Sequence, residues 1–119
     1  MLKILQRIAK FVQMNYSYLL SMPPRIIGRK LRLCFKDGSA MDIYYPNENE
    51  YSLHWWKGNI IVRIDTAPHH KHIRTFPRHI HYLREDNVIE DYITNELNSP
   101  EENVRQFIEF LQSRKLLQV

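Results

Sequence analysis

All six histidines of this 119-residue chain fall in one short stretch, between His54 and His81. Histidine has an unperturbed pKa close to neutrality, so it is a common proton donor and acceptor in catalysis and a common metal ligand. Charged side chains such as Arg63, Asp65 and Arg78 interleave with the rings. This density of titratable groups indicates a polar working surface. The alternative is a solvated loop that is merely rich in histidine.

Metal-independent cleavage of RNA needs few groups, and this stretch contains the right types. The 2′-hydroxyl must lose a proton, the 5′-oxygen must gain one, and the charge that develops on the phosphate must be balanced. His79 and His81 are two residues apart, so on a strand they would share one face. The further candidates are His54 and His69 for proton transfer and Arg63 and Arg78 for charge stabilisation.

A metal site is the second interpretation of the same residues. The sequence His79-Ile-His81 would present two imidazoles on one strand face, where a divalent metal could bind. The third ligand would be His69, His72 or Asp65. A His-hydrophobic-His strand also occurs in single-strand DNA nucleases that use a tyrosine nucleophile, for which Tyr92 is the candidate. The preferred mechanism remains the one without a cofactor.

Three aromatic residues lie in predicted strands close to the histidines, namely Tyr44, Trp56 and Tyr82. Aromatic side chains stack on the unpaired bases of single-stranded nucleic acids. Aromatic residues in strands more commonly pack in a hydrophobic core. Base stacking is therefore a hypothesis for these three residues, with packing as the alternative.

Charge is distributed unevenly along the chain, whose net charge is +4. The first 36 residues hold eight Lys and Arg and no acidic residue, whereas residues 85–119 hold eight acidic residues against three basic ones. Such asymmetry is typical of proteins that bind polyanions. The residues predicted to bind nucleic acid are Lys3, Arg7, Lys10, Arg29, Lys30, Arg32 and Arg78. A third hypothesis follows, in which the chain is no enzyme and its basic residues bind nucleic acid or an acidic protein.

The single cysteine, Cys34, excludes a disulfide within the chain and favours a reducing compartment. Residues 1–20 are rich in apolar side chains, but Lys3, Arg7 and Lys10 interrupt them. No apolar run approaches the ~20 residues that a membrane span needs, and no cleavage signal follows. We therefore expect a cytoplasmic protein that does not contact membranes.

Periodicity predicts helices at both ends of the chain. The first covers residues 1–22 and is ended by Pro23-Pro24. Residues 88–117 are expected to form a short helix followed by a longer one. The segment 99–102 begins the longer helix, with serine at the N-cap, proline at N1 and glutamate at N3.

Alternation with period two predicts an antiparallel sheet over residues 26–83, with the histidine-rich loop before its last strand. If Gly58-Asn59 is a two-residue hairpin loop, Trp55 lies opposite Val62 and His54 lies opposite Arg63. One face would then be buried, formed by Leu53, Trp55, Val62 and Ile64. The other would carry His54, Arg63 and Asp65.

The expected architecture is a single α+β domain over residues 1–119. It consists of an antiparallel sheet of four to five strands, with the N-terminal and C-terminal helices packed on one face. The opposite face is left to polar side chains, and a ligand would bind there.

Three separated segments also follow one another in a specific order. They are Tyr51-Ser-Leu-His-Trp55, Arg63-Ile-Asp-Thr-Ala-Pro-His-His70 and Thr75-Phe-Pro-Arg-His-Ile-His81. Together they resemble the TumE family, the toxins of certain bacterial and archaeal toxin–antitoxin pairs. The resemblance covers roughly residues 29–82 and does not extend to residues 1–24, which include the N-terminal helix. At Thr66 the chain departs from the asparagine expected of the family.

The resemblance implies growth inhibition that a co-encoded antitoxin protein neutralises. The functional residues it implies by position are His54, Arg63, Asp65, His69, His79 and His81. By analogy with other small α+β toxins, the chain is a candidate endoribonuclease that binds RNA. The alternatives are a metal-dependent nuclease with the ion at His79 and His81, or a binding module without activity. Homo-oligomerisation is left open.

Overall fold

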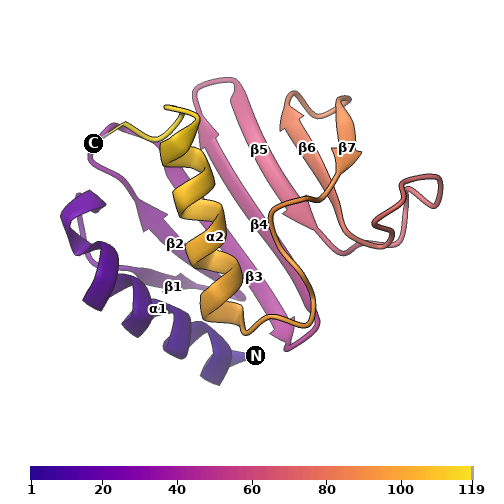
Figure 1. Ribbon diagram of the computed structural model, residues 1–119. Helices are drawn as coiled ribbons and strands as arrows, with labels where there is room; N and C mark the ends of the chain where they lie inside the picture. Colours follow the sequence, from indigo (N-terminus) through magenta and orange to yellow (C-terminus); the bar gives the residue numbers. More distant parts are fainter. Residues whose placement is uncertain (119) are drawn as a thin grey trace.

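The computed structural model describes residues 1–118, in which seven antiparallel strands form one sheet in chain order (Figure 1). The strands are β1 (Arg25–Ile27), β2 (Lys30–Cys34), β3 (Ala40–Asn47), β4 (Glu50–Lys57), β5 (Ile60–Asp65), β6 (His79–Leu83) and β7 (Val88–Glu90). The helices are α1 (Leu2–Tyr16) and α2 (Pro100–Ser113), with a 3-10 turn, η1 (Ser17–Leu19), after α1. The α+β class is confirmed, but the expectation of four to five strands is wrong.

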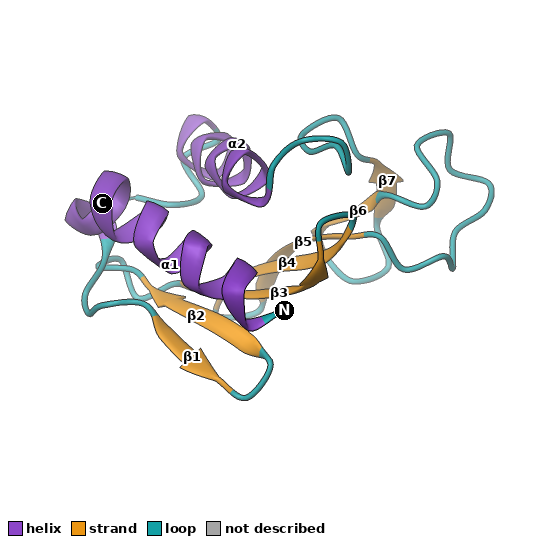
Figure 2. Ribbon diagram, turned by 90° about the horizontal axis from the view of Figure 1, so that it is seen from below, coloured by secondary structure: helices purple, strands orange, loops and turns teal. Residues whose placement is uncertain are grey.

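Both helices lie on the same side of the sheet, as expected (Figure 2). The hydrophobic core fills the space between them and the sheet. Leu33, Ile43, Trp55 and Val62 supply the sheet side of this core and are each at most 1% exposed. The helices bury one stripe each, Leu5, Ile8 and Val12 from α1 and Val104, Phe107, Ile108 and Leu111 from α2. This core leaves the opposite face of the sheet free of helices.

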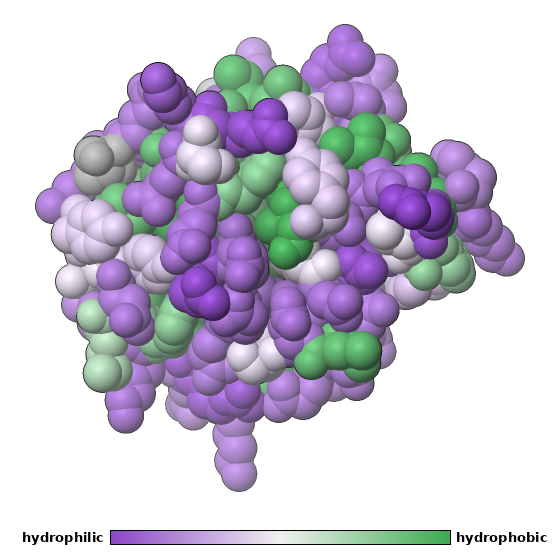
Figure 3. Space-filling model, viewed as in Figure 1, coloured by the Kyte–Doolittle hydropathy of each residue, from purple (hydrophilic) through white to green (hydrophobic). Residues whose placement is uncertain are grey.

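The outward surface of the helical layer is mostly hydrophilic, with apolar side chains in separate spots (Figure 3). Neither helix of the described chain is long and apolar enough to cross a membrane.

The predicted register of the central hairpin is confirmed. Gly58 and Asn59 form the two-residue loop between β4 and β5, and Gly58 has the positive φ of +58° that favours glycine. Trp55 pairs with Val62, and His54 pairs with Arg63. Because side chains alternate along a strand, this register puts the polar partners together on the face away from the helices.

Two short strands at the sheet edges account for the difference in strand number. β1 forms a hairpin with β2 through Gly28, whose φ is +60°. β7 pairs with β6, where Val88 lies opposite His81. Each strand has three residues, which is too short for alternation to identify it in the sequence.

The prediction of a short helix that begins at residue 88 is wrong, because α2 is the only helix between residues 88 and 117. After β7, the side chain of Asp91 accepts hydrogen bonds from the backbone N–H groups of Ile93 and Thr94. Such local bonds compete with helix formation and turn the chain. The predicted start of α2 is confirmed, since the Ser99 hydroxyl accepts from the N–H of Glu102 and Pro100 is the first helical residue.

The N-terminal helix is also shorter than expected, ending at Tyr16 rather than near residue 22. Leu20 instead forms an antiparallel bridge with Phe35. The N–H of Lys36 donates to the carbonyl of Leu19, and the N–H of Ser21 donates to the carbonyl of Cys34. These backbone groups pair with the end of β2 and so cannot continue a helix.

Asn103 of α2 fastens the segment between β7 and α2 to the sheet. The residue is fully buried, and its Nδ2 donates to the hydroxyl of Tyr45 and to the carbonyl of Asn95. Its Oδ1 accepts from the N–H of Asn95 and from Nδ2 of Asn98. Every polar group of this buried side chain is therefore used.

Replacing Asn103 with leucine should lower the free energy of unfolding by about 1–3 kcal/mol, because the partners of the lost amide stay buried without hydrogen bonds. Urea denaturation of the wild type and the variant measures this difference. Asn98→Ala, which removes only one partner from a half-exposed position, is the matched control and should have a smaller effect. An unchanged urea midpoint for Asn103→Leu would contradict the assigned role.

Candidate functional site

Paired residues of neighbouring strands form two polar rows on the face of the sheet opposite the helices. In the first row, Arg63 of β5 lies between His54 of β4 and His81 of β6. In the second row, Asp65 of β5 pairs with His79 of β6. The antiparallel register therefore brings together five of the six residues that the sequence predicted.

The carboxylate of Asp65 lies at the centre of these residues and is only 8% exposed. Its Oδ1 accepts from the backbone N–H of Ala67 at 3.0 Å and lies 3.0 Å from Nε2 of His79. Its Oδ2 accepts from Nε of Arg63 at 3.1 Å and lies 4.0 Å from Nε2 of His81. A buried carboxylate is stable only with such partners, so Asp65 orders the surrounding groups.

His79 and His81 are fixed in orientation by backbone carbonyls. Nδ1 of His79 lies 3.0 Å from the carbonyl oxygen of Pro77, and Nδ1 of His81 lies 2.7 Å from that of Glu85. A carbonyl only accepts, so both Nδ1 atoms carry a proton. The Nε2 atoms of both rings face the carboxylate of Asp65, at 3.0 Å for His79 and 4.0 Å for His81.

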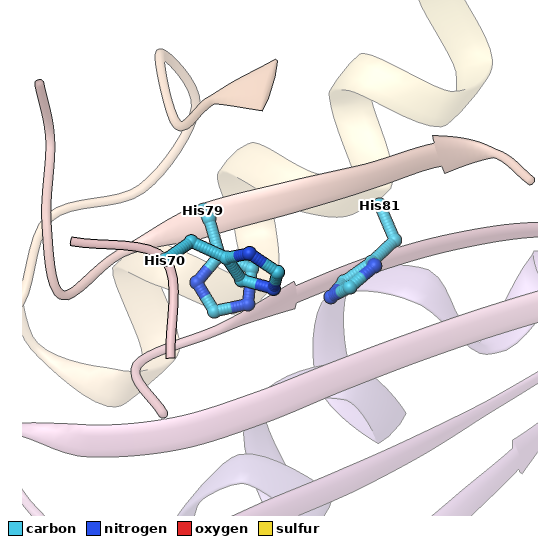
Figure 4. A group of neighbouring side chains, drawn as sticks. All are labelled: His70, His79 and His81. Carbon is cyan, nitrogen blue, oxygen red and sulfur yellow. The ribbon is translucent and has the colours of Figure 1, made fainter. Parts of the chain in front are cut away.

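His70, from the loop between β5 and β6, completes the cluster (Figure 4). Its ring centroid is 4.6 Å from that of His79 and 5.6 Å from that of His81. One nitrogen from each of the three rings lies within 4.8 Å of the others. His70 is half-buried whereas His79 and His81 are buried, so His70 is the ring most open to a substrate.

Arg63 is held by two carboxylates. Besides its bond to Asp65, its guanidinium donates to both oxygens of Glu85, with Nη1 3.0 Å from Oε2. Burial acts to lower the pKa of Arg63, but the bonds to Glu85 and Asp65 outweigh it and raise that pKa. The same bond with Arg63 lowers the pKa of Glu85. Glu85 is 60% exposed in its side chain, so this end of the ion pair lies at the surface.

Two histidines have lowered pKa values, which favour the neutral form of the ring. The pKa of His54 is lowered by its burial and by the charge of Arg63. The pKa of His70 is lowered by desolvation and by the neighbouring rings, first that of His79. A neutral ring near pH 7 can accept a proton, which suits His70 to the role of a base.

The loop histidine that joins the cluster is His70, which sequence reasoning did not single out. His69 and His72 were the candidates in the loop, but both are exposed, whereas the ring of His70 lies over His79 and His81. Within an irregular loop, adjacent residues have no fixed period, so no pattern distinguishes them. Tyr92, the proposed nucleophile, is not on a helix and packs against Phe110 of α2 on the other side of the sheet.

The guanidinium of Arg78 is occupied by partners within the protein and has a structural role. Its Nη1 donates to the carbonyl of Thr94 at 2.6 Å and lies 3.3 Å from the carboxylate of Asp91, while its Nε lies 2.7 Å from Glu96. The side chain is 14% exposed. Arg78 therefore holds the segment after β7 against the start of β6.

The remaining predicted nucleic-acid ligands divide into two groups. Arg7 is paired with Glu48 and Glu101, and Arg32 makes a bidentate pair with Asp42. Four are exposed and form no ion pair within residues 1–118, namely Lys3, Lys10, Arg29 and Lys30. Lys3 and Lys10 belong to α1, on the helical side of the sheet, and Arg29 and Lys30 belong to the β1–β2 hairpin, at the sheet edge opposite β6 and β7. The basic residues and the histidine cluster are thus separate surfaces.

The three aromatic candidates also have different surroundings. Tyr44 lines a groove beside Asp65 on the polar face. Trp56 is covered by the guanidinium of Arg32, 5.4 Å from its ring centroid. Tyr82 packs against Phe110 on the helix side. Of these three aromatic residues, only Tyr44 therefore lines the groove next to the histidine cluster.

Comparison with known proteins gives one result. A family model described as toxin TumE matches residues 2–115, which include both helices as well as the sheet. The match is thus wider than the segment over residues 29–82 that carried the resemblance in the sequence. No curated protein and no solved structure matches the chain.

The lowered pKa values of His54 and His70 predict a pH dependence of stability. The unfolded chain takes up protons on these rings near the ordinary value of 6.5, whereas the folded protein does so only at lower pH. The free energy of unfolding should therefore fall as the pH is lowered below about 6.5. In the double variant His54→Gln/His70→Gln this dependence should be weaker, as measured by urea denaturation from pH 7.5 to 5.5. Equal slopes for both proteins would refute the prediction.

Proposed function

Since this chain belongs to the TumE toxin family, we propose that it inhibits growth by cutting RNA at the cluster around Asp65. Family membership makes the chain the toxin half of a toxin–antitoxin pair and implies a cognate antitoxin as its partner. The observation that carries the nuclease proposal is the gathering of Arg63, His70, His79 and His81 around one buried carboxylate. These are the group types that RNA cleavage requires.

In the proposed mechanism the neutral ring of His70 takes the proton of the 2′-hydroxyl. The 2′-oxygen then forms a bond to phosphorus, the bond to the 5′-oxygen breaks, and protonated His81 supplies the proton that this oxygen needs. The products are a 2′,3′-cyclic phosphate and a 5′-hydroxyl. His81 suits the role of the acid because its Nδ1 is already held by the carbonyl of Glu85, which leaves Nε2 for the substrate.

Arg63 would balance the charge that develops on the phosphate. In the free protein Glu85 is paired with the guanidinium of Arg63. The phosphate of the substrate would displace the carboxylate of Glu85, whose side chain is exposed. Asp65 and His79 are positioning residues in this mechanism. Asp65 fixes Arg63 and His79, and His79 in turn supports the ring of His70.

Replacing His70 or His81 with glutamine should lower the rate of RNA cleavage by roughly 10²-fold or more, because each substitution removes one proton-transfer group. His72→Gln is the matched control, since this ring lies in the same loop but is exposed. Cleavage of a mixed-sequence RNA by the purified proteins measures the effect, and circular dichroism verifies the fold. A folded His70→Gln or His81→Gln variant with wild-type activity would contradict the assigned roles.

A metal-dependent nuclease is the second candidate, and the geometry of the three rings favours it. Their nitrogens lie within 4.8 Å of one another, and His79 and His81 each use Nδ1 to donate to a carbonyl, as metal-ligating histidines commonly do. A divalent ion bound there would supply an activated water and polarise the phosphate.

Metal analysis and EDTA distinguish the two mechanisms. The metal-independent mechanism predicts that cleavage persists in EDTA and that the purified protein carries no stoichiometric metal. Stoichiometric zinc or manganese that is lost in His70→Gln, together with cleavage that EDTA abolishes, would replace it with the metal mechanism. Absence of cleavage under both conditions would leave a toxin that acts without cutting RNA.

A further inference from the structure

A groove of about 690 Å³ opens on the polar face directly beside Asp65. Its floor is formed by strands β3 to β5, and its wall by the two ends of the loop between β5 and β6. The lining residues that matter here are Tyr44, Glu50, Ser52, Asp65 and Phe76. This volume is typical of sites for small ligands.

The groove continues from the candidate catalytic cluster. Tyr44 pairs with Ser52, Ser52 pairs with Asp65, and Asp65 pairs with His79, so one row of the sheet carries both features. Asp65 lines the groove and also binds Arg63. A nucleotide whose phosphate binds Arg63 can therefore place its base in the groove.

Aromatic and apolar side chains make the groove suitable for a flat ring. Tyr44 belongs to the floor, and Phe76, which is 39% exposed, belongs to the wall. The Oγ1 of Thr66 accepts from the N–H of Tyr51, which holds the start of the loop against β4. Aromatic side chains stack on any of the four nucleobases, because every base has a π-face. Tyr44 and Phe76 would therefore add affinity for a base but would not distinguish one base from another.

Glu50 is the group that can select among bases. Its Oε1 accepts from Nδ2 of Asn47 at 2.9 Å, which orients the carboxylate at the rim of the groove. A carboxylate accepts hydrogen bonds and repels phosphate. Guanine presents two neighbouring donors, N1–H and the N2 amino group, and can bind a carboxylate with both. Adenine and cytosine offer one amino group on this edge, and uracil offers only N3–H.

We propose that this groove is the base-binding subsite of the toxin and that Glu50 makes it selective for guanine next to the phosphate that is cut. The substrate class rests on the proposed ribonuclease function, whereas the binding of the base does not depend on cleavage. Tyr44 and Phe76 stack on the base, Ser52 offers a hydroxyl beside it, and Arg63 receives the phosphate.

Isothermal titration calorimetry with guanosine 3′-monophosphate and uridine 3′-monophosphate tests the proposal directly. The wild type should bind the guanosine nucleotide at least tenfold more tightly. Glu50→Gln should bring the two affinities close together by weakening the guanosine nucleotide alone. Phe76→Ala should weaken both by roughly tenfold. Glu48→Gln is the matched control, because Glu48 lies on the same turn but pairs with Arg7 outside the groove, and it should bind as the wild type does.

Equal affinities in the wild type, or an unchanged preference in Glu50→Gln, would overturn the proposal. Cleavage of RNA by the wild type is measured in parallel, so that the two claims fail separately. Cleavage without preference for guanosine, combined with equal affinities, refutes the guanine subsite and leaves the nuclease intact. Selective binding that depends on Glu50 in a protein that cuts no RNA supports the subsite and refutes the nuclease.

Discussion

The site depends on the way the buried carboxylate of Asp65 is satisfied. Removing a carboxylate from water is costly unless charged or N–H groups replace the lost hydration. Here a backbone N–H, a guanidinium and an imidazole surround it, contributed by Ala67, Arg63 and His79. These partners come from the end of β5, from the loop that follows and from β6. Satisfying one charge thus ties the start of the loop that carries His70 to β5 and β6.

This arrangement in turn depends on the register of the antiparallel sheet. The face towards the helices needs Trp55, Val62 and Ile80 in the core, where each is at most 1% exposed. Once the hydrophobic side of each strand is set, the polar side is set as well, and Arg63 must lie between His54 and His81. A slip of one residue would place charged side chains in the core. The packing of the core therefore determines the geometry of the polar face.

The regular parts of this structure were predictable from the sequence because they repeat. The two-residue loop at Gly58 fixed the pairing of β4 with β5, and the alternation of His79 and His81 placed both rings on one face. The start of α2 at Ser99 was equally clear, since the N-cap is a local interaction. Each of these features is encoded within a few neighbouring residues.

The irregular parts depend on contacts between distant residues and were not predictable. β1 and β7 are strands because they pair with β2 and β6, not because three residues show a pattern. His70 rather than His69 or His72 joins the cluster because the folded loop brings its ring against His79 and His81 of β6, a contact that no local pattern encodes. Arg78 binds Asp91 and Thr94 in the segment after β7, which the sequence predicted to be a helix.

The rate of RNA cleavage by Asp65→Asn, compared with the wild type at the same pH, tests the central claim most directly. An asparagine has the same shape, but its amide would place a donor against one of the donors of Ala67, Arg63 or His79. The account predicts a loss of roughly 10²-fold or more in a folded protein. A folded Asp65→Asn variant that cuts RNA as fast as the wild type would show that this carboxylate does not organise the site.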